Sequence, residues 1–242
     1  MMTQYLETKK QYPDCILFYR LGDFYEMFFE DALTASRELE ITLTGKDCGL
    51  EERAPMCGVP YHALEGYLSK LVQKGYKVAI GEQVEDPKTA KGLVKREVIR
   101  VVTPGTITNS QALEESKNNY LMGIVYTDGI FGISVADVST GDYLVTEVKS
   151  ERNLIDEIYK FSPSEIICNE AFYMSGIDLD DLKNRLHAVI SDLDNRFFSD
   201  EFCRKLLRDH FHVENLEGLG LSDYETGTIA AGAVLQYLYE TQ

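Results

Sequence analysis

Apolar and polar positions alternate in short blocks over residues 1–44, which predicts several small elements rather than one long helix. Residues 4–11 have the composition of a short helix, and the run Ile16-Leu17-Phe18-Tyr19 predicts a buried strand. After a break at Gly22-Asp23, apolar residues return at helical spacing and predict a helix. Its apolar stripe consists of Phe24, Phe28, Ala32, Ala35 and Leu39, and a short strand is predicted over 41–44.

The blocks that follow predict a mixed α/β domain. A polar stretch over 45–55 predicts a loop, and amphipathic spacing over 61–74 predicts a helix. Alternation of apolar and polar residues predicts strands over 76–82 and 94–103. Strands that alternate with helices in this way are typical of a compact α/β unit.

A linker is predicted over 106–118, because these polar residues follow Pro104-Gly105 and lack sustained apolar periodicity. It divides the chain into a domain over 1–113 and a second domain over 114–242. The second domain opens with strands predicted over 120–126, 130–138 and 142–148, and Asp128-Gly129 is a favoured two-residue hairpin turn.

The rest of the second domain is predicted to contain a helix over 151–161, a strand over 165–168 and a last helix over 226–241. Three antiparallel strands followed by helix and strand units are the order of ribonuclease H-like folds. The sequence ends inside the pattern of the last helix, so we expect it to be part of a longer protein.

Composition narrows the class of protein without naming a function. Apolar residues make up 44% and charged residues 26% of the 242, which is typical of a globular chain. The five cysteines are scattered and odd in number, which predicts a reducing, cytoplasmic environment without disulfides or a zinc site. No apolar run is long enough to span a membrane.

The formal net charge of −16 argues against nucleic acid as a partner for the chain as a whole. The charge is uneven, however: residues 1–113 hold 14 basic and 16 acidic residues, which leaves 10 basic and 24 acidic residues for 114–242. A basic cluster with a single acid, Glu97, lies within the thirteen residues 88–100. It consists of Lys88, Lys91, Lys95, Arg96 and Arg100. The first domain could therefore meet a polyanion locally, although a solvated strand face explains the cluster equally well.

The sequence argues against two kinds of chemistry. A nucleotide-binding Walker A loop fails, because Asp47 follows Gly45-Lys46 where Ser or Thr is needed and Glu40 replaces the first glycine. A metal-dependent nuclease remains an alternative for a ribonuclease H-like fold. Its candidate ligands are Asp128, Asp137 and Asp142. Two of these border hairpin turns, and the single remaining carboxylate does not hold two metal ions.

The segment from Leu17 to Phe28 groups aromatic residues and a carboxylate around a turn. From the residues alone, Asp23 and Glu26 form an Asp-x-x-Glu capping box at the start of the predicted helix. In that interpretation Phe24 and Phe28 pack into the core.

The same segment resembles the signature of the MutS family of DNA mismatch-repair proteins, whose Phe-x-Glu motif matches Phe24-Tyr25-Glu26. The resemblance covers the whole chain in order. It continues through Pro55-Met56-Cys57-Gly58-Val59-Pro60-Tyr61-His62-Ala63, Ala79-Ile80-Gly81-Glu82-Gln83, Asp86-Pro87, Arg100-Val101-Val102-Thr103-Pro104-Gly105-Thr106 and, more loosely, Leu235-Gln236-Tyr237.

This resemblance implies that 1–113 is a mixed α/β mismatch-binding domain and 114–242 a ribonuclease H-like connector domain. Phe24 would then enter the minor groove as an apolar wedge and stack on a mismatched base, and Glu26 would hydrogen-bond that base. Leu21, Gly22 and His62 would lie near the DNA backbone, with Lys95 and Arg96 as candidate phosphate contacts.

The resemblance also implies partners and cofactors. Mismatched duplex DNA is the expected ligand, MutL the expected partner of the connector domain, and a homodimer the expected full-length assembly. ATP and Mg²⁺ belong to the ATPase domain of full-length members, so neither a cofactor nor an enzymatic activity is expected in this chain. A protein-interaction role without DNA binding remains a further alternative.

Overall fold

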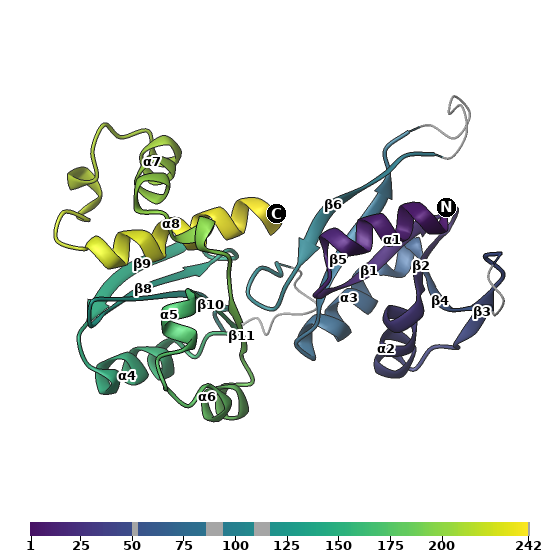
Figure 1. Ribbon diagram of the computed structural model, residues 1–242, viewed down its shortest axis with the longest axis horizontal. Coiled ribbons are helices and arrows are strands. Elements are labelled where there is room, and N and C mark those ends of the chain that lie inside the picture. The colour runs from purple at the N-terminus through teal and green to yellow at the C-terminus, as the bar shows by residue number, and fades with distance from the viewer. Residues whose placement is uncertain (50–52, 86–93, 109–116, 242) are drawn as a thin grey trace. The chain divides into compact units, whose positions relative to one another are not determined.

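The computed structural model describes residues 1–49, 53–85, 94–108 and 117–241. These residues divide into two compact units, the first over Met1–Thr103 and the second over Pro104–Thr108 together with the chain from residue 117 onward. Each unit has its own sheet (Figure 1). The predicted boundary at 113/114 lies outside the described residues. The first residues of the predicted linker do not form one, because Thr106 and Ile107 are buried.

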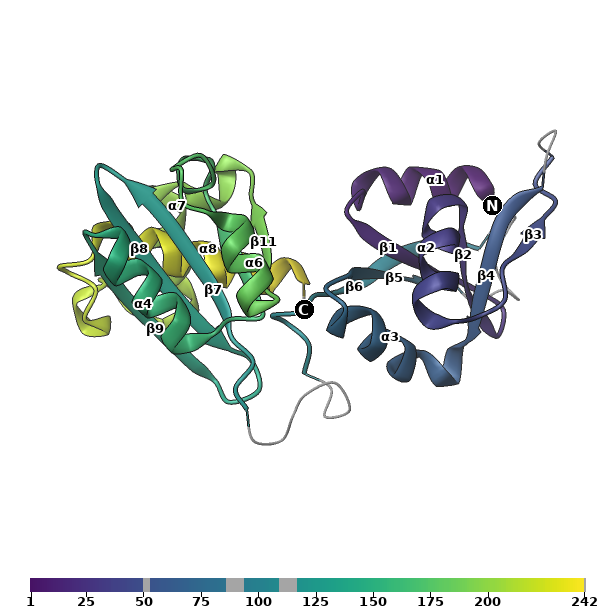
Figure 2. The same ribbon diagram turned by 90° about the horizontal axis from the view of Figure 1, so that it is seen from below.

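The first unit is a six-stranded mixed sheet in the order β3-β4-β2-β1-β5-β6, counted over the described residues. Its elements are α1 (Met2–Gln11), β1 (Cys15–Leu21), β2 (Phe24–Phe28), α2 (Phe29–Leu39), β3 (Thr44–Lys46), β4 (Ala54–Pro60), the 3₁₀ turn η1 (Tyr61–Ala63), α3 (Leu64–Gln73), β5 (Lys77–Gln83) and β6 (Arg96–Val102). Helix α1 covers one face of this sheet, and α2 and α3 cover the other (Figure 1 and Figure 2).

The helix predicted to begin at Phe24 is wrong in its first turn. Residues Phe24–Phe28 form β2, which pairs with β1 on one side and β4 on the other. Helix α2 begins only at Phe29, and Phe28 at its N-cap makes no side-chain capping hydrogen bond. The capping box of Asp23 and Glu26 is therefore wrong as well. Pairing with the adjacent β1 and with β4, which is distant in sequence, outweighs the helical spacing of the aromatic residues.

Other differences in this unit are smaller. The strand predicted over 41–44 lies three residues later as β3, and both β3 and the start of β4 occupy the predicted loop over 45–55. The helix predicted over 61–74 begins with the 3₁₀ turn η1 before α3. The loop over 86–92, with Lys88 and Lys91, lies outside the described residues.

The second unit has a five-stranded sheet in the order β11-β10-β7-β8-β9 over the described residues. Its elements are β7 (Leu121–Thr127), β8 (Ile130–Asp137), β9 (Asp142–Val148), α4 (Glu151–Phe161), β10 (Glu165–Cys168), α5 (Glu170–Tyr173), α6 (Leu179–Leu186), β11 (Val189–Asp192), η2 (Asn195–Phe198), α7 (Asp200–Phe211), η3 (Glu217–Leu219) and α8 (Glu225–Thr241). Strands β7, β8 and β9 are antiparallel, and β10 and β11 run parallel to β7. This confirms the predicted strand order and the α/β fold class.

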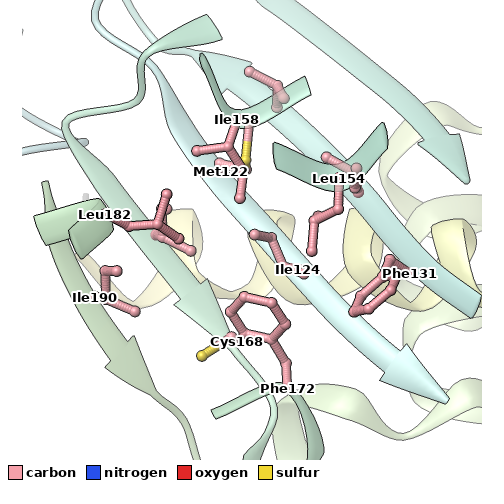
Figure 3. Packing of buried hydrophobic residues seen from close by; sticks show 12 residues of the cluster. Met122, Ile124, Phe131, Leu154, Ile158, Cys168, Phe172, Leu182 and Ile190 are labelled. Carbon is pink, nitrogen blue, oxygen red and sulfur yellow. The ribbon is translucent and has the colours of Figure 1, made fainter. Parts of the chain in front are cut away.

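Helices cover both faces of the second sheet. The residues in Figure 3 form the core under α4, α5 and α6, and Met122 and Ile124 of β7 lie at its centre. Helix α8 packs on the opposite face (Figure 2). It approaches closely because position 132 of β8 is glycine: a Cβ there would lie 2.3 Å from the backbone carbonyl of Thr226.

Candidate nucleic-acid interface

One end of the first sheet gathers most of the residues that the sequence singled out. Gly22-Asp23 is a tight turn between β1 and β2, with Gly22 at a φ of +60°, a conformation that glycine adopts without strain. Leu21 and Phe24 face each other across this turn, and Phe24 also pairs with Pro60 of β4. His62 follows two residues later in η1 and is exposed.

Phe24 and Glu26 project from the same face of β2, since side chains alternate along a strand. Tyr25 and Met27 point the other way and are buried. Phe24 remains 48% exposed, whereas Phe28, four residues along the same strand, is 1% exposed in the core. The structure thus leaves one phenylalanine in solvent at the end of the strand and buries the other.

A hollow of ≈ 550 Å³ lies beside Phe24 and Glu26. It is lined by Phe24, Glu26, Glu40, Ile41, Thr42, Thr44, Met56 and Gly58. Gly58 pairs directly with Glu26, and a Cβ at that position would lie 3.3 Å from the carbonyl oxygen of Tyr25 and 3.6 Å from Cγ of Glu26. The glycine therefore keeps the space beside the carboxylate open.

Lys46 at the end of β3 makes an ion pair with Glu26, with Nζ 2.5 Å from Oε2. The Glu26 side chain is 17% exposed and that of Lys46 is 32% exposed, so both groups are partly withdrawn from water. The sequence placed Lys46 in a loop and gave no signal for this contact, because β4 separates β3 from β2 in the sheet.

Arg20 is a second residue that the sequence reasoning missed. Its Nε donates to the carbonyl oxygen of Gly22 at 2.5 Å, and its guanidinium lies 4.1 Å from the ring centroid of Tyr61. The backbone N–H of Tyr61 in turn donates to the carbonyl oxygen of Asp23 at 2.9 Å. Arg20 therefore fastens the β1–β2 turn to η1, next to Phe24. Its planar, multidentate fork suits this position better than an ammonium group.

Arg20 is itself held by a partly buried ion pair. One of its terminal nitrogens lies 3.6 Å from Oε2 of Glu82, which also accepts a hydrogen bond from the Tyr25 hydroxyl at 2.5 Å. Burial, together with this hydrogen bond and the charge of Glu82, raises the pKa of Tyr25 to about 12. The hydroxyl therefore keeps its proton and continues to donate at neutral pH.

Lys95 and Arg96, the two candidate phosphate contacts, have different environments. Arg96 donates from Nε to the carbonyl oxygen of Arg20 at 2.7 Å and from a terminal nitrogen to Val94, so it ties β6 to the end of β1. Lys95 is exposed and pairs with the exposed Glu97. The structure brings Arg96 to the same end of the sheet as Leu21 and Phe24, while the Lys95 ammonium remains in solvent.

Comparison with known families decides what this architecture is. The family model described as MutS domain I matches residues 1–111, and that of MutS domain II matches residues 119–242. The chain belongs to the MutS family. The resemblance read from the sequence is confirmed.

Curated MutS-family relatives match over the whole chain. The DNA mismatch repair protein MutS of Lachnoclostridium phytofermentans is 66% identical over 242 residues, that of Acetivibrio thermocellus 56% over 245 and that of Clostridioides difficile 51% over 245. All of this chain is covered in each match, but only 26%, 28% and 25% of the relatives. The chain thus spans about a quarter of their length.

The nuclease alternative for this MutS-family chain receives no support. Asp128 lies in the β7–β8 turn, Asp142 accepts a hydrogen bond from Asn118, and Asp137 is buried. Burial alone would raise the pKa of Asp137, but hydrogen bonds from the Ser139 hydroxyl and from neighbouring backbone N–H groups outweigh it and hold the pKa below its usual range. No cluster of three or more metal-ligating side chains occurs in the part of the chain that the structure describes.

Asp137 accepts hydrogen bonds from the backbone N–H and the hydroxyl of Ser139, which organise the turn before β9. The described helices also include none that is long and apolar enough to cross a membrane.

Proposed function

We propose that this chain supplies the mismatch-reading part of a DNA mismatch-repair protein. In this proposal the first unit kinks duplex DNA at a mismatched or unpaired base, with Phe24 as the wedge and Glu26 as the hydrogen-bonding group. The observation that carries it is the half-exposed Phe24 at the end of a central strand, with a carboxylate on the same face two residues away. Membership of the MutS family supports it.

Phe24 has the chemistry of an intercalating wedge. A mismatch weakens local stacking and makes the duplex easier to kink. A protein that kinks DNA therefore spends less deformation energy at a mismatch than at matched base pairs. Stacking an aromatic ring on a base contributes about 1–3 kcal/mol. A correctly paired base resists the ring, because its own pairing and stacking must first be broken.

Glu26 gives discrimination rather than affinity, since a carboxylate is repelled by phosphates. A hydrogen bond to the displaced base offsets that repulsion at a mismatch and is absent on matched duplex. Leu21, Gly22 and His62 would then lie beside the DNA backbone, and Lys95 and Arg96 would provide positive charge near the phosphates.

The second unit serves protein contacts in this proposal. Residues 114–242 carry 24 acidic and 10 basic residues, a charge that disfavours DNA. We assign to it the contact with MutL and to the full-length protein the homodimeric assembly. ATP and Mg²⁺ would act in domains other than these two, so this chain is expected to turn over neither ATP nor DNA.

The test is a pair of titrations with matched and G·T-containing duplexes, using the full-length gene product that contains this chain. Glu26→Gln removes the negative charge but keeps the size, so binding to matched duplex should tighten while the preference for G·T falls. Incubation of matched duplex with Mg²⁺ should give no cleavage. An unchanged G·T preference in Glu26→Gln would refute the role of Glu26, and Mg²⁺-dependent cleavage lost in Asp137→Asn would restore the nuclease alternative.

A further inference from the structure

The carboxylate proposed to meet DNA already has a partner in the protein. Lys46 contacts Glu26 through a 2.5 Å ion pair that bridges β3 and β2 across β4. The Lys46 ammonium also lies 5.5 Å from the ring centroid of Phe28, against apolar surface. In the described residues, Lys46 is the one cation recorded in an ion pair with Glu26.

This pair changes the electrostatics of the site. A free carboxylate at the end of β2 would repel every duplex, because double-stranded DNA carries closely spaced phosphate charges. Paired with Lys46, Glu26 repels DNA less than a free carboxylate would. Partial burial of both side chains also protects the pair from the full screening of water and salt.

We infer that Lys46 is a specificity-determining counter-ion, which holds Glu26 until a displaced base offers the carboxylate a hydrogen bond. On matched duplex no such bond is available, so Glu26 stays on Lys46, which offsets part of its repulsion. At a mismatch the carboxylate exchanges the ammonium for the base. The inference rests on the proposed function of Glu26 and adds a regulator to that site.

The exchange predicts an unusual direction for Lys46 variants. Loss of Lys46 leaves Glu26 uncompensated on matched duplex, so affinity for matched DNA falls. On mismatched duplex the base still satisfies the carboxylate, and no ammonium competes for it. The mismatch-to-match ratio therefore rises when Lys46 is removed, opposite to its fall when Glu26 is removed.

The experiment is a double-mutant cycle in the full-length gene product, with Lys46→Met, Glu26→Gln and the double variant titrated against matched and G·T duplexes. Contacting charged residues commonly couple strongly, and we expect Lys46→Met to raise the mismatch-to-match ratio about fivefold. In the Glu26→Gln background the same substitution should leave the ratio unchanged. Lys46→Arg should restore the wild-type ratio, because it keeps the charge.

Controls separate this effect from folding and from simple phosphate binding. Lys74→Met removes another ion pair of the same unit, Lys74–Glu38 at 3.1 Å, and should leave the ratio unchanged. Thermal melting of Lys46→Met should stay close to wild type, because partly exposed ion pairs contribute little to stability.

Each possible result has a distinct meaning. A plain phosphate contact predicts that Lys46→Met weakens both duplexes equally in both backgrounds, and this result overturns the inference while the proposed function stands. The inference also fails if the ratio falls, or if its rise persists in Glu26→Gln. If the single variant Glu26→Gln keeps the mismatch-to-match ratio of the wild type, the proposed function itself is refuted.

Discussion

Phe24→Ala separates a DNA wedge from a core residue. A phenylalanine side chain buries about 200 Å² when fully enclosed. Phe24 is 48% exposed, so roughly 100 Å² is withdrawn from water. At about 25 cal/mol per Å² this sets an upper limit of about 2.5 kcal/mol on the loss of stability, and the compact denatured chain and the retained Cβ reduce it to about 1–1.5 kcal/mol.

The loss of binding free energy on mismatched DNA should be similar in size to this loss of stability, but it has a different cause. Removing one base–aromatic stack costs about 1–3 kcal/mol, or roughly five- to 150-fold in affinity. In the proposed function the ring does not enter matched DNA, so the loss should fall on G·T-containing duplex and leave matched duplex almost unchanged.

Phe28→Ala is the matched control, since Phe28 lies on the same strand and the same face but is 1% exposed. Its truncation should cost about 3–5 kcal/mol of unfolding free energy. Urea denaturation and fluorescence anisotropy on both variants measure the two effects. The reasoning is refuted if Phe24→Ala destabilises the fold as much as Phe28→Ala, or weakens matched and mismatched duplex equally.

Three further predictions concern other parts of the chain. Arg20→Lys should weaken binding to G·T-containing duplex about tenfold, because one ammonium cannot replace both the hydrogen bond to Gly22 and the stacking on Tyr61. Titration of both Arg20→Lys and Arg20→Met with this duplex checks the prediction, since the two variants should lose the same affinity. Because the pKa of Asp137 is lowered in the folded state, its ionised form contributes stability that is complete above the ordinary pKa of about 3.9 and is lost as pH falls through the folded pKa. In urea unfolding, the free energy of unfolding should therefore decrease less between pH 6 and pH 2 in Asp137→Asn than in the wild type. Gly132→Ala should destabilise the second unit by at least about 2 kcal/mol, since its Cβ would overlap the α8 backbone; calorimetry in which this variant melts like wild type would contradict the packing.

Elements set by local chemistry were predicted well from the sequence. The helix over 151–161 and the strand over 165–168 coincide with α4 and β10. The Asp128-Gly129 turn has both residues at positive φ, as a two-residue hairpin of this kind requires. In each case the signal lies within a few residues, so no distant part of the chain is needed to interpret it.

The candidate site was predicted only in part, because its geometry comes from contacts distant in sequence. Phe24 and Phe28 have a spacing that fits a helix face and also one face of a strand, and the pairing of β2 with β1 and β4 decides between them. Lys46 contacts Glu26 across β4, and the local sequence pattern does not predict the register of that strand. Arg20 carries no motif signal that distinguishes it from any arginine at a strand end.

The position of β2 inside its sheet has a kinetic consequence. Strand β2 is paired with β1 on one side and β4 on the other, so the backbone at Phe24 is ordered before it meets a ligand. Little protein rearrangement is then needed in the encounter, and association rates for matched and mismatched duplexes should be similar. In the proposed function, the two duplexes would therefore differ mainly in how long they stay bound.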